Sequence, residues 1–290
     1  MADRPRFGPA GRPIGFKGKT FEVPKYLRDE GLDAFEFQAV RWGDKPQISM
    51  FDAEKLKSEA EKNDVWLSMH ASYFINFCGD EKTIKSSIAR LLACVKAAKW
   101  MHAHIVVFHP GFYKGKSKKE ALETCIKSLW RVEDAMKSLN IKNVYLGPET
   151  TGKQTQLGSV EEIIKICEEV DIAKPVVDWA HIHARNGDGC LKGKEDYIRV
   201  LNLIEEHLGG DTVKNLHIHY TRVEFTRKGE RKHHTMDEKE YGPDFKPFAE
   251  LIAEFDLKPV IISESPILDL DSIKMKEIVM SEIKKRTKIS

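Results

Sequence analysis

Short apolar runs alternate with longer amphipathic segments along most of the chain. The runs are rich in Val, Ile, Leu and Phe, and most are continuous rather than alternating, which is typical of strands covered on both faces. Eight such runs can be counted, at residues 14–18, 34–39, 65–70, 104–109, 143–149, 174–178, 215–219 and 259–264. Strands that alternate with helices along a chain predict a parallel sheet.

The segments between the runs have the period of helices. We expect helices at residues 52–63, 81–101, 118–139, 159–170, 194–207, 245–255 and 272–285. Ser159, followed three residues later by Glu162, is a capping-box signature that marks the start of one of them. Eight strand-helix units in about 275 residues predict a TIM (β/α)₈ barrel of the α/β class. Since no linker interrupts the pattern, we expect a single domain over residues 1–290, with an N-terminal extension at 1–13 and a long loop after the seventh strand at 221–245.

The composition restricts the partners and the compartment. Lys and Arg number 47 against 45 Asp and Glu, so a polyanion would have to be bound by a local basic face. The five cysteines are scattered without a Cys-x-x-Cys pair, which favours free thiols in a reducing compartment. The amino terminus lacks the apolar segment of a secretory signal, and no run approaches the ~18 apolar residues of a membrane span. We therefore expect a cytoplasmic monomer with no membrane partner.

The third to eighth runs all end on or beside a histidine or a carboxylate. In a TIM barrel the carboxyl ends of the strands meet at one rim, where active sites lie. The six residues are His70, His109, Glu149, Asp178, His217 and Glu264. Burying such groups without partners would cost several kcal/mol. A shared metal site removes that cost, because imidazole nitrogens and carboxylate oxygens are ligands of zinc and similar ions.

Two further histidines can reach the same rim. His181 follows Asp178 in the sequence Asp-Trp-Ala-His, and His233 lies in the polar segment after the seventh strand. The remaining histidines are assigned ordinary core or surface roles; they are His102, His104, His183, His207, His219 and His234. The residues alone thus predict a metal site of eight ligands.

Several motifs together carry a family resemblance. They are SMHASYFINF (68–77), FHPG (108–111), PETTG (148–152), DWAH (178–181), LHIH (216–219), KHH (232–234) and SESP (263–266). With these motifs in order over nearly the whole chain, the sequence resembles the endonuclease IV family of apurinic/apyrimidinic endonucleases, within the xylose-isomerase-like TIM barrels. The segment at 70–76 together with FHPG is the most specific part of the match.

The resemblance implies a three-zinc site. The first ion would be held by His70, His109 and Glu149. The second would be held by Glu149, Asp178, His217 and Glu264, with Glu149 bridging. The third would be held by His181, His233 and an aspartate two residues before His233.

The sequence departs from the family at the third ion and after the seventh strand. Arg231 stands at the position of the expected aspartate. The third ion is therefore absent, held by the two histidines alone, or completed by Glu230 from one residue away. We expect two or three Zn²⁺ ions, with Mn²⁺ or another divalent ion as the alternative. His219-Tyr220 also replaces the Asn-Asp that family members tend to carry.

The resemblance implies a DNA-repair enzyme that hydrolyses the phosphodiester 5′ to an abasic site in double-stranded DNA. Two metals about 3.5–4 Å apart supply a hydroxide and stabilise the attacking and leaving oxygens. Glu149 would bridge them, and Glu264 would orient or deprotonate the water. Phosphate contacts are expected from Arg227, Lys228, Arg231 and Lys232. Tyr73 matches a family position that enters the DNA, and Arg41 with Trp42 would act as a second wedge.

Two other functions fit parts of the pattern. A single-metal sugar isomerase or epimerase needs only Glu149, Asp178, His217 and Glu264, and leaves the other four histidines unexplained. A non-catalytic DNA-damage binder would keep part of the cluster for structure, and the Arg231 departure is the reason to consider it.

Overall fold

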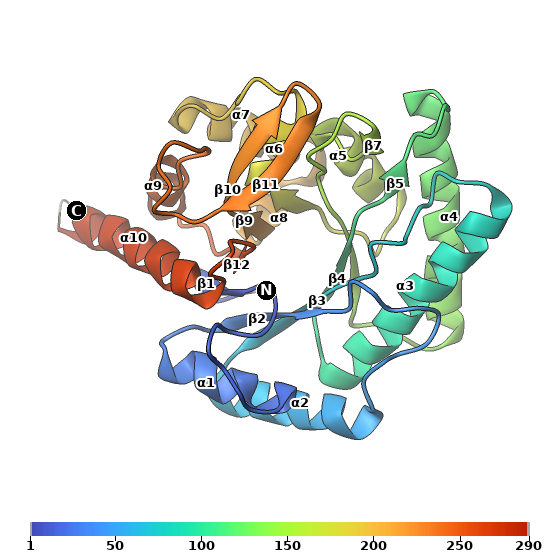
Figure 1. Ribbon diagram of the computed structural model, residues 1–290, viewed down its shortest axis with the longest axis horizontal. Coiled ribbons are helices and arrows are strands. Elements are labelled where there is room, and N and C mark those ends of the chain that lie inside the picture. Colours follow the sequence, from blue (N-terminus) through green and yellow to red (C-terminus); the bar gives the residue numbers. More distant parts are fainter. Residues whose placement is uncertain (1, 289–290) are drawn as a thin grey trace.

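Eight parallel strands form a closed ring at the centre of the molecule (Figure 1). The computed structural model describes residues 2–288. One arc of the ring, in spatial order, consists of β1 (Arg6–Pro9), β12 (Val260–Ser263), β9 (His217–Tyr220) and β8 (Val176–Asp178). The other consists of β2 (Ala34–Gln38), β3 (Trp66–His70), β4 (Ile105–Phe108) and β6 (Tyr145–Pro148).

Isolated parallel bridges join the two arcs. Ala10 pairs with Glu36 on one side, and Glu149 pairs with Val176 on the other. These bridges close the ring, so the predicted TIM barrel is confirmed.

Helices surround the strands on the outside (Figure 1). The seven predicted helices are confirmed as α2 (Met50–Asn63), α3 (Glu81–Met101), α4 (Lys118–Ser138), α5 (Val160–Glu169), α7 (Lys194–Leu208), α9 (Lys246–Glu254) and α10 (Asp269–Thr287). Short ones that the periodicity did not reveal are η1 (Thr20–Glu22), α1 (Val23–Asp29), α6 (Trp179–Arg185) and α8 (Gly210–Lys214). The predicted capping box is present, since Ser159 Oγ accepts the N–H of Glu162 and the Glu162 carboxylate accepts the N–H of Ser159. Within residues 2–288 no helix is long and apolar enough to cross a membrane.

The first strand was predicted in the wrong place. Residues 14–18 form a turn followed by irregular backbone, and the strand is β1, inside the segment predicted as an N-terminal extension. Its short sequence Arg-Phe-Gly-Pro has little strand propensity, which hid it. The glycine is required, however, because a Cβ at Gly8 would lie 1.7 Å from the carbonyl oxygen of Ala34 on β2. Only a residue without a side chain lets the two strands approach this closely.

Residues 221–245, predicted as a loop, contain a hairpin. It consists of β10 (Arg222–Thr226) and β11 (Gly229–His234), which pair antiparallel. Figure 1 shows it as two orange arrows beside α6. A second small antiparallel pair, β5 (Gly111–Phe112) and β7 (Gln156–Leu157), follows β4 and β6.

The interior of the barrel is partly polar. Alternate residues of each strand face inward, and Ile105, Val107 and Val176 make one buried apolar cluster there. The larger core, which includes Val106 and Phe108, lies between the strands and the helices. Glu36, in the middle of β2, is buried with no exposed area. A charged group therefore lies where such barrels usually hold branched apolar side chains.

Candidate metal centre

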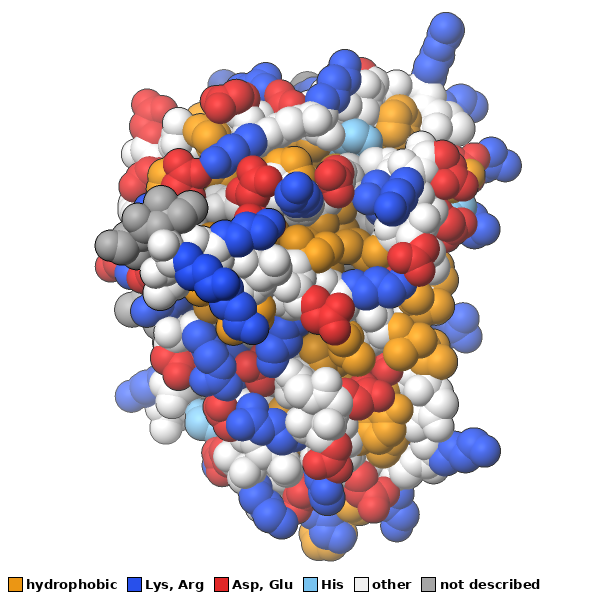
Figure 2. Space-filling view, turned by 90° about the vertical axis from the view of Figure 1, so that its left-hand side faces the viewer, with side chains coloured by type: hydrophobic (Ala, Val, Ile, Leu, Met, Phe, Trp, Pro, Cys, Tyr) orange, Lys and Arg blue, Asp and Glu red, His pale blue; other side chains and the backbone are white. Residues whose placement is uncertain are grey.

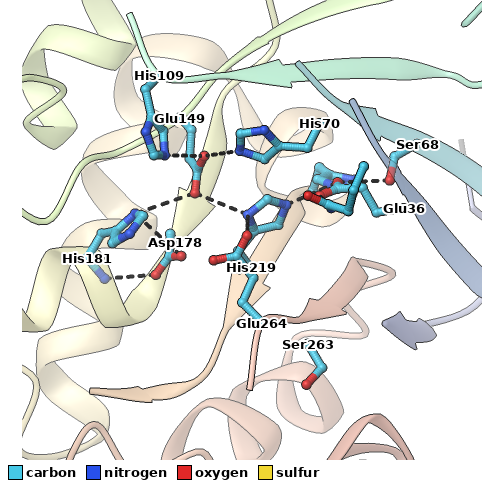
Figure 3. A network of polar contacts seen from close by, with 12 residues as sticks. Glu36, Ser68, His70, His109, Glu149, Asp178, His181, His219, Ser263 and Glu264 are labelled. Carbon is cyan, nitrogen blue, oxygen red and sulfur yellow. Dashed lines mark hydrogen bonds and ion pairs between the residues drawn. The ribbon is translucent and has the colours of Figure 1, made fainter. Parts of the chain in front are cut away.

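Glu149, which follows β6, is the centre of a group of imidazoles (Figure 3). Its carboxylate is fully buried. Glu149 Oε2 lies 3.0 Å from His109 Nε2 and 3.3 Å from His70 Nε2. Glu149 Oε1 lies 3.1 Å from His219 Nδ1 and 3.4 Å from His181 Nδ1. The two oxygens thus face two different sets of ligands.

Three groups of possible ligands share this end of the barrel, and in each the ligand atoms lie within 4.8 Å of one another. The first group is His70, His109 and Glu149. The second group is Glu149, Asp178, His219 and Glu264. The third group is His181, Glu230 and His233. We call these three groups the carboxyl-end cluster.

The strands and the helix after β8 position these side chains. His70 is the last residue of β3, and His109 directly follows β4. Asp178 ends β8 and also caps α6, where its Oδ1 accepts the N–H of His181 at 2.8 Å. One carboxylate therefore joins the second group and fixes the helical turn that brings His181 to the third.

The structure does not bring His217 into the carboxyl-end cluster. His217 begins β9, and its Nε2 lies 3.1 Å from Glu36 Oε2, deeper in the barrel. His219 takes the expected place, with Nδ1 3.2 Å from Glu264 Oε1. Both histidines face inward because strand side chains repeat every two residues. The position of a residue in a strand therefore predicts the face on which its side chain lies, but not its depth in the barrel.

Glu230 completes the third group because of a bulge in the hairpin. Glu224 pairs with Lys232 and Phe225 pairs with Glu230, so Arg231 is an extra residue on β11. A bulge re-aims the side chains on either side of it. Glu230 Oε2 accordingly lies 3.3 Å from His181 Nε2, and Glu230 Oε1 lies 3.3 Å from His233 Nε2. Arg231 is exposed and pairs with Glu224 instead.

Backbone carbonyls orient three of the histidines. Nδ1 of His70 hydrogen-bonds the carbonyl of Ala71 at 2.9 Å, and Nδ1 of His181 hydrogen-bonds that of Thr150 at 2.8 Å. Nδ1 of His233 hydrogen-bonds the carbonyl of Glu264 at 3.0 Å. Since a carbonyl only accepts, Nδ1 carries the proton in each ring and Nε2 is left for a ligand.

The charges of the cluster balance one another. Burial alone would raise the pKa of Glu149, but the neighbouring His219 and His109 hold that pKa well below its usual range. Burial lowers the pKa of His219, yet Glu36 and Glu149 hold it well above its usual value. Burial raises the pKa of Asp178 to about 7, and the nearby Glu264 and Glu149 add to this despite His181. Without metal, protons on the imidazoles therefore compensate the carboxylates.

The cluster has the properties of a metal centre. Asp178 Oδ2 is buried and makes no hydrogen bond with any described residue. The donors are imidazole nitrogens and carboxylate oxygens, which suit zinc and similar divalent ions. A cavity of ≈ 260 Å³ leads to them, lined by residues that include His109, His181, His233 and Glu264. The residues present thus fit bound ions at a position that a small substrate group can reach.

The comparisons with known proteins identify the family of the chain. A family model described as xylose isomerase-like TIM barrel matches residues 24–280. The chain belongs to the xylose isomerase-like TIM barrel family. An uncharacterized protein of Methanocaldococcus jannaschii is 33% identical over 270 residues, which cover 92% of this chain and 94% of that protein. A probable endonuclease 4 of Aquifex aeolicus is 26% identical, over 77% of this chain and 80% of that one.

Solved structures of other proteins share the fold. Endonuclease IV from Thermus thermophilus superimposes with a TM-score of 0.72 at 18% identity, covering 97% of this chain and 100% of that one. A D-tagatose 3-epimerase-like protein superimposes with a TM-score of 0.64 at 16% identity, covering 92% of this chain and 95% of that one. At such identities the likeness concerns the barrel alone. The resemblance to endonuclease IV stated from the motifs is confirmed.

The predicted DNA-contacting residues of this xylose isomerase-like barrel differ in accessibility. Tyr73 is 54% exposed, and its ring stacks on that of His109 with 5.9 Å between centroids. Arg41 is exposed, as are the basic residues of the hairpin, Arg227, Lys228, Arg231 and Lys232. Trp42 is only 6% exposed and packs edge-on against Phe37. The prediction of Trp42 as a wedge was therefore wrong, because its ring belongs to the core.

Proposed function

We propose that this protein is an apurinic/apyrimidinic endonuclease of DNA repair. It would hydrolyse the phosphodiester 5′ to an abasic site with a multinuclear metal centre. The observation that carries the proposal is the number of ligand groups. A single-metal sugar isomerase needs only the second group, Glu149, Asp178, His219 and Glu264. The first and third groups add five residues at the same mouth, which that function does not use; they are His70, His109, His181, Glu230 and His233.

The residues of the cluster would divide the work. Two or three Zn²⁺ ions, or Mn²⁺ or another divalent ion, would supply an activated water and charge for the attacking and leaving oxygens. Glu149 can bridge the first and second groups, because Oε2 faces His109 while Oε1 faces His219. Glu264 lines the cavity, where its carboxylate can orient a water or take its proton.

Double-stranded DNA with an abasic site is the proposed partner. The formal net charge is only +2, and Figure 2 shows Lys and Arg interspersed with Asp and Glu on the face that it views. Attraction to DNA must therefore be local. Exposed Arg227 and Lys228 at the hairpin tip would contact phosphates, while Tyr73 at the cavity mouth would fill the place of the missing base. An abasic nucleotide costs little to extrude because it has no base to unstack.

The alternatives keep limited support. The second ligand group by itself favours a sugar isomerase or epimerase, and solved epimerase-like structures share the barrel. The damage binder was considered because Arg231 replaces an expected aspartate. The position of Glu230 supports the nuclease instead, because the bulge turns its carboxylate toward His181 and His233.

One assay separates the three functions. Metal-loaded protein is incubated with end-labelled duplex DNA that contains one abasic analogue, and with ketose sugars in parallel. Incision directly 5′ to the analogue supports the proposal. Interconversion of sugars without incision supports the isomerase and refutes the nuclease. Tight binding of the abasic duplex with neither reaction supports the damage binder.

A further inference from the structure

Glu36 is a buried carboxylate that the proposed reaction does not use. It lies on β2 and faces the barrel interior beneath the carboxyl-end cluster (Figure 3). Its side chain has no exposed area. Burying a charge costs several kcal/mol unless partners compensate it. The contacts of Glu36 should therefore show what compensates its buried charge.

The partners of Glu36 are specific. Its Oε2 accepts hydrogen bonds from Nε2 of His219 and Nε2 of His217, both at 3.1 Å. The same oxygen accepts the Ser68 hydroxyl at 3.0 Å, and Oε1 accepts the Gln38 amide at 3.2 Å. Figure 3 shows the His219 ring between Glu36 on one side and Glu149 on the other. A single imidazole thus connects this deeper carboxylate to the carboxyl-end cluster.

His219 is oriented differently from the other histidines of the cluster. His70, His181 and His233 bond backbone carbonyls through Nδ1 and leave Nε2 for a ligand. His219 instead directs Nδ1 toward Glu149 and Glu264, and Nε2 toward Glu36. Its ring points across the barrel, where strand carbonyls are committed to the parallel ladder. The acceptor for Nε2 of His219 is instead a side chain of another strand, Glu36 on β2.

We propose that Glu36 is a positioning residue, which holds the proton of His219 on Nε2 and so aims the Nδ1 lone pair at the ion of the second ligand group. The inference rests on the metal centre of the proposed function. A carboxylate behind a ligating histidine fixes its tautomer and ring orientation and strengthens the bond to the metal. His217 supports Glu36 from below through its own Nε2.

A competing arrangement uses the same residues. Glu36, His217 and His219 also lie close enough together to hold an ion of their own. In that case Nε2 of His219 would carry a metal instead of a proton, and removal of Glu36 would remove one whole ion. In our proposal, removal of Glu36 leaves the number of ions unchanged.

The test is a Co²⁺ titration of the metal-free full chain and of its Glu36→Gln variant. We expect equal numbers of ions at saturation, with the affinity for one ion lowered by about 10- to 100-fold. The matched control is His104→Gln, a half-buried imidazole directly before β4, whose Nδ1 bonds the carbonyl of Leu67 rather than Glu36. It should bind Co²⁺ as the unaltered protein does. Unchanged affinities in Glu36→Gln, or the loss of one whole ion at saturation, would overturn the proposal.

A second measurement needs no variant of Glu36. In ¹⁵N spectra of the unaltered zinc-loaded protein, His219 should carry its proton on Nε2 and the metal on Nδ1, the reverse of His181 and His233. A metal on Nε2 of His219 would overturn the inference even if Glu36→Gln failed to fold. Failure to bind any ion would refute the metal centre itself, whereas normal binding that is indifferent to Glu36 would refute only its role as a positioning residue.

Discussion

Glu230 faces His181 across the mouth of the barrel, with 3.3 Å between Glu230 Oε2 and His181 Nε2. The two residues come from β11 and α6. Arg231, which stands where the family resemblance implies an acidic ligand, is turned away by the bulge and pairs with Glu224. The carboxylate one residue earlier on the strand therefore faces the two histidines of the third group, and the bulge gives it that direction.

Replacing Glu230 should remove one bound ion. In Glu230→Gln the third group keeps two imidazoles and loses its charged oxygen, so we expect one fewer ion per chain at moderate metal concentrations. Incision of abasic DNA should fall by at least about 10-fold. Metal analysis of the dialysed protein checks the stoichiometry. The matched control is Arg231→Ala, which should retain every ion; a loss there would show that the bulged residue has a role at the site.

Replacing His109 should damage the first group. His109 Nε2 lies 3.0 Å from Glu149 Oε2, so His109→Ala removes a ligand next to the bridging carboxylate. We expect incision to fall by about 100-fold or more. His102→Ala is the control, because its exposed ring bonds Glu61 far from the cluster. Full incision by His109→Ala would refute the first ion site.

The metal-free protein should lose stability as the pH rises. Burial lowers the pKa of His233, but Glu230, Glu264 and Asp178 outweigh it and raise that pKa from 6.5 to about 9. A group whose pKa is higher in the folded state than in the unfolded state stabilises the fold fully at pH values below its unfolded-state pKa. For His233 this stabilisation disappears as the pH rises through about 9.

Thermal unfolding of chelator-treated protein between pH 6 and pH 10 would measure this. His233→Gln should flatten the dependence. Zinc-loaded protein should show the opposite trend over the lower part of this range, because ions bind deprotonated imidazoles. A metal-free protein that gains stability as the pH rises would contradict the prediction.

The hairpin tip should control the salt dependence of DNA binding. Arg227 and Lys228 are exposed between β10 and β11. If each contacts one phosphate, the double substitution to alanine should reduce the slope of log affinity against log salt by about two. Fluorescence anisotropy with an abasic duplex in several salt concentrations would test this. The comparison variant, Lys284→Ala with Lys285→Ala on α10, should leave the slope unchanged.

Gly8 should tolerate no side chain. A Cβ there would lie 1.7 Å from the carbonyl oxygen of Ala34, so Gly8→Ala must push β1 away from β2. We expect a loss of at least about 3 kcal/mol of unfolding free energy, since backbone atoms of a closed barrel give way poorly. Gly43→Ala, where a Cβ has open space, is the control. Urea unfolding of both variants measures the difference.

Hydrophobic periodicity predicted most of the fold because long helices and continuous apolar strands leave strong patterns. β1 was missed because four residues that include glycine and proline leave none. The hairpin was missed because its strands carry mostly polar residues, such as Glu224 and Lys232.

At the site, the predicted end of a strand located the candidate ligand only to within two residues. His217 and His219 lie on the same face of β9. They differ in depth, because His219 contacts Glu149 whereas His217 contacts Glu36. The sequence contained no signal that Glu36 has a role at the site, because a single carboxylate within an apolar run is also found in ordinary strands. Its proposed role depends on its contact with His219, which lies 183 positions away in the sequence.

The hairpin would also make the ions of the proposed metal centre exchange at different rates. Glu230 and His233 sit on β11, outside the ring, and their side chains are 22% and 23% exposed, whereas those of His70 and Glu149 are 2% and 0% exposed. An ion held partly by residues of β11 can leave after a local movement of this strand, without any opening of the barrel. On dilution into chelator, the ion of the third group should therefore depart first and return last.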